Sequence, residues 1–178
     1  MEKLLINDGN LEPKDIDGVE IRVKAFIVNS DNEVLILHNN NTYQLPGGHK
    51  KKDESLEESL EREIYEETGI QVDIKDEAFM LITEYNKNFL NTGKNICNKI
   101  YYYEVITDEL PHFDSLNLTE LESRTDLKIN YVKIDKIEEF IEESKNNNMM
   151  NELIAYELVK AIKIYKEQML RRSIWKRY

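Results

Sequence analysis

The sequence contains a single cysteine, Cys97, among its 178 residues. One cysteine cannot form an internal disulfide, and it provides no cysteine-based zinc site. Long apolar runs are also missing. The apolar run at residues 4–6 is too short for a signal peptide, and no stretch is long enough to span a membrane. These absences predict a protein of the reducing cytoplasm with no membrane partner.

Positive charge is also scarce, with 24 Lys and Arg against 35 Asp and Glu and a formal net charge of −11. This balance argues against binding a nucleic-acid backbone by charge alone, and no segment resembles a DNA-binding domain. An acidic protein that acts on phosphates needs cations at its site, so the charge favours metal-dependent chemistry. The remaining composition, 40% hydrophobic and 33% charged, is typical of a globular domain.

Residues 55–68 are predicted to form a helix of about four turns. Ser55 and Glu58 have the spacing of a capping box, in which each side chain bonds the other residue's backbone N–H. One apolar face is formed by Leu56, Leu60 and Ile64. Gly69 follows the last periodic residue and is expected to end the helix in a left-handed conformation.

The predicted helix carries three acids, Glu63, Glu66 and Glu67, on one side. Glu67 projects between Leu60 and Ile64, at the margin of the apolar face. Clustered carboxylates repel one another, and burial raises that cost, so they need compensation. A divalent cation with oxygen ligands, Mg²⁺ or Mn²⁺, is the simplest compensation. The alternative is an ordinary Glu-rich helix face in water.

Residues 48–70 resemble the Nudix box in every fixed position. The pattern is Gly, five residues, Glu, seven residues, Arg-Glu, an aliphatic residue, any residue, Glu-Glu, any residue, Gly and an aliphatic residue. The matching residues are Gly48, Glu54, Arg62, Glu63, Ile64, Glu66, Glu67, Gly69 and Ile70. The resemblance implies the Nudix fold, an α/β (α+β) architecture with a mixed β-sheet sandwiched between helices and, here, an extra C-terminal helix. It also implies a Mg²⁺-dependent hydrolase (Mn²⁺ being the alternative metal) that cleaves a pyrophosphate bond in a nucleoside diphosphate linked to another moiety.

The resemblance also implies roles for single residues. The expected metal ligands are Gly48, through its carbonyl, and Glu63, Glu66 and Glu67. Arg62 is expected to hold a box glutamate in place, and Glu54 to stabilise the loop or assist in an outer shell. Either Glu63 orients or deprotonates the attacking water, or a glutamate outside the box does so. For that second role Glu122 is favoured over Glu120.

The rest of the chain is predicted to alternate strands and helices. Strands are expected at 19–28, 33–38, within 72–85, at 96–107 and at 130–135, and helices at 136–145 and from 149 onward. Substrate specificity is expected to lie in the loops 86–95 and 108–127 and in side chains of the first strands. Residues 49–52, His-Lys-Lys-Lys, are more typical of solvated surface than of a phosphate contact.

The predicted division is a Nudix hydrolase domain at 1–148 and an amphipathic helix at 149–178 with a net charge of +4. That helix is expected to pack on the same domain, with a homodimer contact or a basic lip over the site as alternatives. The expected partner is a nucleotide-type small molecule. One rival is a non-catalytic Nudix-like module that binds a nucleotide as a regulator. Another is an isoprenoid diphosphate isomerase, whose chemistry needs a well-placed cysteine, unlike Cys97. Substrate identity and oligomeric state remain open.

Overall fold

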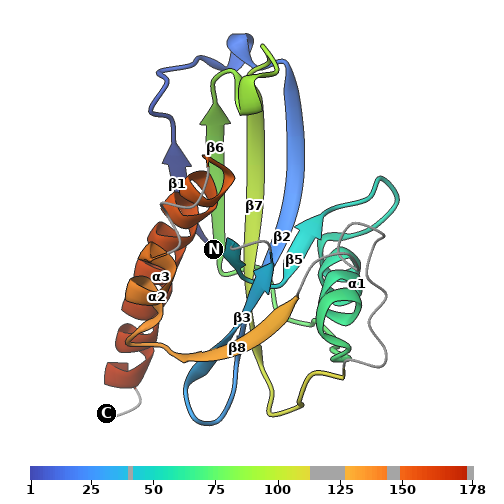
Figure 1. The fold of residues 1–178 in the computed structure, drawn as a ribbon, viewed down its shortest axis with the longest axis vertical. Coiled ribbons are helices and arrows are strands. Elements are labelled where there is room, and N and C mark those ends of the chain that lie inside the picture. Colours follow the sequence, from blue (N-terminus) through green and yellow to red (C-terminus); the bar gives the residue numbers. More distant parts are fainter. Residues whose placement is uncertain (40–41, 113–126, 144–148, 176–178) are drawn as a thin grey trace. The chain divides into compact units, whose positions relative to one another are not determined.

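The computed structural model of the chain describes residues 1–39, 42–112, 127–143 and 149–175 (Figure 1). The chain divides into two compact units. The first unit comprises Met1–Phe26, Pro46–Val105 and Glu109–Asn117. The second unit comprises Ile27–Leu45, Ile106–Asp108 and Leu118–Tyr178. Each unit is described by itself below.

A mixed sheet forms the body of the first unit. Its strands are β1 (Glu2–Ile6), β2 (Gly18–Val28), β5 (Gly47–His49), β6 (Met80–Asn86) and β7 (Ile96–Ile106). Strand β1 runs parallel to β6, which runs antiparallel to β7, and β7 is hydrogen-bonded to β2. Strand β5 is antiparallel to β2, with Gly48 opposite Val23. Short 3-10 helices at Pro13–Asp15 and Phe89–Asn91 lie in the connections.

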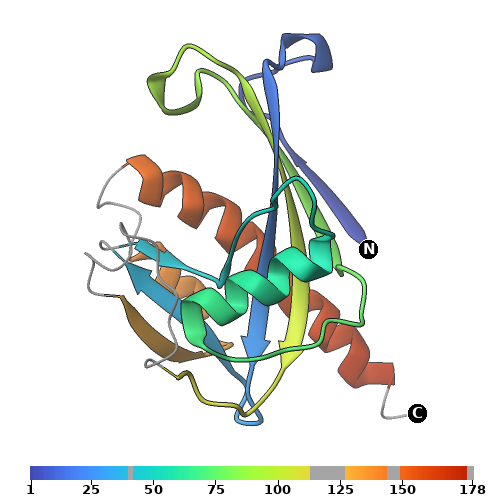
Figure 2. The ribbon, with the colours of Figure 1, turned by 90° about the vertical axis from the view of Figure 1, so that its right-hand side faces the viewer.

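Helix α1 (Leu56–Thr68) is the only α-helix among the described residues of the first unit. It begins with the predicted capping box, since Ser55 Oγ accepts from Glu58 N at 3.0 Å and Glu58 Oε2 accepts from Ser55 N at 2.8 Å. It ends at Gly69, whose φ of 74° is the left-handed conformation that glycine adopts at little cost. Leu60 and Ile64 are fully buried, and the helix lies in front of β2 and β7 in Figure 2. The predicted helix is confirmed.

In its described residues, the second unit combines three strands and two helices. These are β3 (Glu33–Asn39), β4 (Thr42–Gln44), β8 (Lys128–Lys133), α2 (Ile137–Glu142) and α3 (Met149–Trp175). Strand β3 pairs antiparallel with both β4 and β8. The packed face of α3 contains Ala155, Leu158, Val159, Ala161, Ile162 and Tyr165. Helices α2 and α3 contact each other, and Lys166 Nζ donates to Glu138 Oε1 at 2.9 Å between them.

The predicted mixed α/β class is confirmed, and most elements lie where the sequence places them. The expected strand content at 72–85 is confined to Met80–Asn86. The backbone N–H of Ile74 instead donates to Glu61 Oε1 at 2.8 Å, so its hydrogen-bond acceptor is a side chain of α1 and not the carbonyl of a neighbouring strand. Strands β4 and β5 have only three residues each, too few to show an alternating pattern. Along the part of the chain that the structure describes, no helix is both long and apolar enough to cross a membrane.

Candidate active site

Arg62, in the middle of α1, is the centre of a network of carboxylates. Its Nε lies 2.6 Å from Glu54 Oε1 and its Nη2 lies 2.9 Å from Glu54 Oε2, which makes a bidentate pair. The same Nη2 donates to the carbonyl of His49 at 3.2 Å. Two parallel charge-assisted bonds fix the plane of the guanidinium, so its remaining N–H groups have a defined direction.

The third nitrogen of Arg62 brings together two glutamates of the box. Nη1 donates to Glu63 Oε1 at 2.7 Å and to Glu66 Oε2 at 3.1 Å. The side chain of Glu63 is 15% exposed and that of Glu66 is 29% exposed, so both are partly accessible to solvent. One cation thus offsets part of the repulsion between two acids that α1 places on the same side.

Gly48 lies directly against the Glu63 carboxylate. A Cβ added at Gly48 would be 2.5 Å from both carboxylate oxygens and from the carboxyl carbon of Glu63. Real Cβ atoms do not approach other heavy atoms this closely, so any other residue would displace the carboxylate. The glycine therefore lets the β5 backbone and the Glu63 carboxylate share one small space.

Glu67 has a different environment from the other two acids. It is only 7% exposed, and its Oε2 accepts from the backbone N–H of Gly47 at 2.8 Å. Gly47 has a φ of 142°, and an added Cβ there would collide with the carbonyl oxygen of Val23. The buried carboxylate thus fixes the turn that leads into β5, and this turn needs glycine.

The Arg62–Glu54 pair shifts the pKa of both groups. Hydrogen bonds from Arg62 are the largest cause that lowers the pKa of Glu54 from 4.5 to about 2. The same bonds to Glu54, followed by those to Glu63, raise the pKa of Arg62 above its ordinary value. Both groups therefore stay charged throughout the physiological range of pH.

The structure brings Arg62, Gly48, Glu63 and Glu66 together, with Glu54 completing the network. Glu67 reaches the same strand, β5, through Gly47 rather than through Arg62. Within the described ranges, no three His, Cys, Asp or Glu side chains stand in the arrangement of a metal centre. Assigning the glutamates and Gly48 as ligands stays a prediction.

The two glutamates considered as an additional base, Glu120 and Glu122, lie outside the described residues. The choice between them and Glu63 also stays a prediction.

Sequence reasoning missed several contacts of this site. The carbonyl of His49 and the hydroxyl of Ser59 both face Arg62 Nη2, at 3.2 and 3.4 Å. Tyr103 on β7 is buried, and its hydroxyl donates to Glu57 Oε1 on α1 at 2.9 Å, so it positions the helix. The spacing between Glu57 and Tyr103 in the sequence carries no signal of this pairing.

Cys97, the single cysteine of the chain, is 4% exposed in β7, and burial raises the pKa of its thiol.

The donor set nevertheless fits a hard divalent cation. Glu63 and Glu66 offer carboxylate oxygens at a partly exposed position, and Mg²⁺ prefers such oxygens while retaining several waters. The space that a Cβ of Gly48 would fill lies at the Glu63 carboxylate, which keeps that group approachable from β5. Each carboxylate oxygen has two lone pairs, so a bond to Arg62 does not exhaust its capacity.

Comparison with known proteins gives the family of the chain. A family model described as "NUDIX domain" matches residues 19–148. A MutT-like protein from Streptomyces ambofaciens is 36% identical over 58 residues, which cover 32% of this chain and only 38% of that protein. The structure of a MutT protein from Bacillus halodurans has a TM-score of 0.51 at 23% identity, covering 67% of this chain and 72% of that chain. A MutT protein from Methanosarcina mazei Go1 has a TM-score of 0.45 at 24% identity, covering 67% and 80%.

Proposed function

Because the chain belongs to the NUDIX family, we propose that it is a Mg²⁺-dependent hydrolase that cleaves a pyrophosphate bond in a nucleoside diphosphate linked to another moiety. The observation that supports this proposal best is the meeting of Glu63 and Glu66 on one nitrogen of Arg62, next to Gly48. Mn²⁺ is the alternative metal, since it takes the same oxygen ligands.

The proposed roles follow from the geometry of the box. Glu63, Glu66 and Glu67, with the Gly48 carbonyl, would hold the cation. When bound, Mg²⁺ neutralises phosphate charge and makes a coordinated water more acidic. Arg62 and Glu54 are positioning residues, because their bidentate pair orients Glu63 and Glu66.

The proton of the attacking water needs an acceptor near the cluster. Glu63 is the candidate in the described residues, with this role in place of its role as a ligand, because its carboxylate is partly exposed and lies against the β5 backbone. Glu122 is the candidate outside them. Charge-removing variants of Glu63, Glu120 and Glu122 would separate these assignments, because loss of the base lowers kcat and removes the acidic limb of the pH profile, where the rate falls as the base becomes protonated.

A panel of nucleotides tests the function as a whole. The purified chain is incubated with nucleoside triphosphates, nucleotide sugars, ADP-ribose, dinucleoside polyphosphates and capped RNA ends, with and without Mg²⁺, and the products are identified. At least one substrate should be cleaved at a pyrophosphate bond only when Mg²⁺ is present, and E66Q should abolish most of that turnover without unfolding the protein. Tight nucleotide binding without any cleavage would favour the regulatory module instead.

A further inference from the structure

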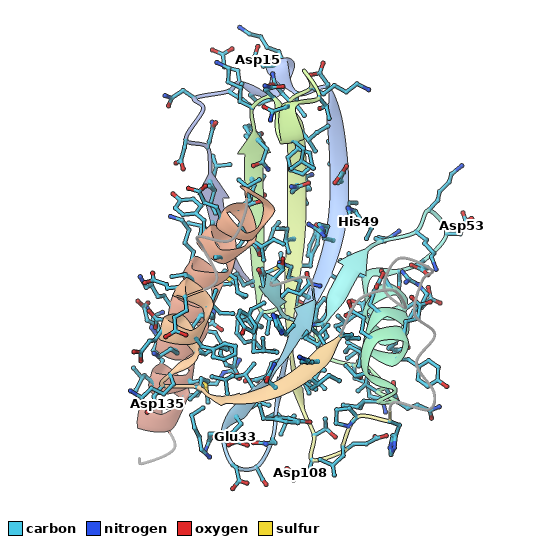
Figure 3. All side chains as sticks on the ribbon, in the orientation of Figure 1. Asp15, Glu33, His49, Asp53, Asp108 and Asp135 are labelled. Carbon is cyan, nitrogen blue, oxygen red and sulfur yellow. The ribbon has the colours of Figure 1, made fainter. Side chains whose placement is uncertain are left out.

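A cavity of about 410 Å³ in the first unit has no role in the proposal above. It is lined by Val19, Glu20 and Ile21 on β2 and by residues 49–52 at the end of β5 and in the loop that follows. We call it the lysine pocket, after Lys50, Lys51 and Lys52. Figure 3 shows His49 beside β2 and Asp53 at the outer end of the same loop.

Within the part of the chain that the structure describes, the lysines of this pocket have no carboxylate partners. Among the described residues, none of the three ammonium groups forms a salt bridge, and Lys50 Nζ donates only to the carbonyl of Lys51, at 3.1 Å. Of the nearby acids, Glu20 belongs to the lining, with its Oε2 3.2 Å from His49 Nε2, and Glu54 binds Arg62. Asp53 follows Lys52 at the outer end of the loop. Three adjacent like charges in a chain of net charge −11 form a local positive site, and an anion would relieve their mutual repulsion.

The backbone of the lysine pocket is held in place by the box itself. Lys50 N donates to Ile21 O at 2.9 Å, and Lys51 N donates to Glu54 Oε2 at 3.0 Å. The carbonyl of His49 accepts from Arg62 Nη2 at 3.2 Å. Because Arg62 also binds Glu63 and Glu66, one guanidinium joins the pocket to the carboxylate cluster. The loop is therefore ordered before a ligand binds, which reduces the entropic cost of binding.

One wall of the pocket is apolar and open to solvent. Val19 is 58% exposed and Ile21 is 36% exposed, although both lie on a strand whose later residues are buried. An apolar wall beside ammonium groups suits a phosphate that is bonded to an organic group, because each part of such a ligand then meets matching chemistry. Free inorganic anions would leave this wall exposed.

We propose that the lysine pocket binds a further phosphate of the substrate, beyond the two phosphates joined by the scissile bond, together with the organic group attached to it. This inference rests on the proposed function, and it names a substrate class: nucleotides with three or more linked phosphates that end in a second organic group, such as dinucleoside polyphosphates. A nucleotide sugar has only the two phosphates of the scissile bond and leaves the ammonium groups without an anion.

The kinetic test compares two triple variants of equal charge change. K50Q/K51Q/K52Q removes the pocket's ammonium groups, and K14Q/K75Q/K136Q removes three exposed lysines outside the pocket and outside the loops expected to set specificity. For a dinucleoside tetraphosphate, the pocket variant should raise KM about tenfold with kcat nearly unchanged, because its ammonium groups bind an unreactive part of the substrate. For a nucleotide sugar, both variants should behave like the unmodified chain. Equal effects of the two triples, or equal effects on the two substrates, would overturn the proposal.

A binding measurement separates this inference from the proposed function. Inorganic triphosphate is titrated calorimetrically into the metal-free protein at low salt. The unmodified chain and K14Q/K75Q/K136Q should bind it, and K50Q/K51Q/K52Q should not. If no nucleotide is cleaved at all, the proposed function fails, and this titration still tests the pocket. Equal triphosphate affinity of all three proteins would show that the lysines do not form an anion site.

Discussion

The Arg62 guanidinium and the Glu54 carboxylate form a bidentate ion pair, in which Nε lies 2.6 Å from Oε1 and Nη2 lies 2.9 Å from Oε2. Glu54 precedes α1 and Arg62 lies in its middle, so the pair closes the loop onto the helix. Nη1 is left to hold Glu63 and Glu66. The orientation of two candidate metal ligands therefore depends on a third carboxylate, which binds Nε and Nη2 of the same guanidinium.

Replacing Arg62 by lysine should damage the site although the charge is kept. Lysine has one ammonium group and cannot reproduce the fork that binds Glu54 while Nη1 binds Glu63 and Glu66. We expect R62K to lose about 10- to 100-fold in Mg²⁺ affinity or in kcat/KM, as for other residues that orient metal ligands. Metal titration with turnover as the readout measures this loss. The control is R171K, in which the replaced side chain is 70% exposed, and it should keep both values. Normal Mg²⁺ dependence of R62K would show that the fork is dispensable.

Glu54 should make the stability of the protein depend on pH. Its pKa is lowered from 4.5 to about 2 in the folded state, chiefly by hydrogen bonds from Arg62. A lowered pKa gives stability that is fully present above pH 4.5 and is lost as the pH falls toward 2. E54Q should therefore be less stable than the unmodified chain at pH 7, and the difference should shrink between pH 4.5 and 2. Urea unfolding at a series of pH values measures it.

The control for this experiment is E139Q, since the Glu139 side chain is 71% exposed on α2. This variant should follow the unmodified chain at every pH. A stability difference between E54Q and the unmodified chain that stays constant from pH 7 to 3 would contradict the pairing of Glu54 with Arg62.

Helix α1 could be predicted from the sequence because its signals are local. The capping box at Ser55 and Glu58, the four-residue spacing of leucine and isoleucine, and Gly69 all lie within one turn of the feature they specify. The shared side of Glu63 and Glu66 follows from the same helical geometry. The structure confirms each of these features.

The contacts made by the loop before α1 could not be predicted in this way. The bond between Glu67 and Gly47 N joins residues 20 positions apart, and it depends on how β5 pairs with β2. The bidentate Glu54–Arg62 pair depends on the same loop folding back over α1. Residue spacing reports on periodic structure, and neither contact follows a period. The Nudix resemblance indicated a role for Glu54 without giving its partner.

Substitution of Gly48 should be costly chiefly because of Glu63, whose carboxylate is the nearest group to an added Cβ. A Cβ at this position would lie 2.5 Å from the Glu63 carboxylate, so G48A should lower the free energy of unfolding by about 1–3 kcal/mol, as for other overpacked sites. In an E63A background the carboxylate is gone, and the same substitution should cost less than about 0.5 kcal/mol. Denaturant unfolding of the four proteins of this cycle measures the coupling. Equal costs of G48A in both backgrounds would mean that the glycine serves the backbone and not the carboxylate.

Substitutions of Glu66 and of Glu67 should differ in their effect on the stability of the protein, even though both residues are expected to bind the metal. Glu67 is 7% exposed and accepts from Gly47 N, so E67A leaves that N–H without its partner and should cost about 1–3 kcal/mol. The Glu66 side chain is 29% exposed, so E66A should stay within about 0.5 kcal/mol of the unmodified chain. The matched variant E67Q keeps a carbonyl oxygen for Gly47 and should recover most of the stability while remaining defective in Mg²⁺-dependent turnover. Thermal unfolding and turnover, measured on the same preparations, distinguish the two effects. Full turnover by E67Q would mean that Glu67 has a structural role only. The carboxylate ligands of the metal would then be Glu63 and Glu66.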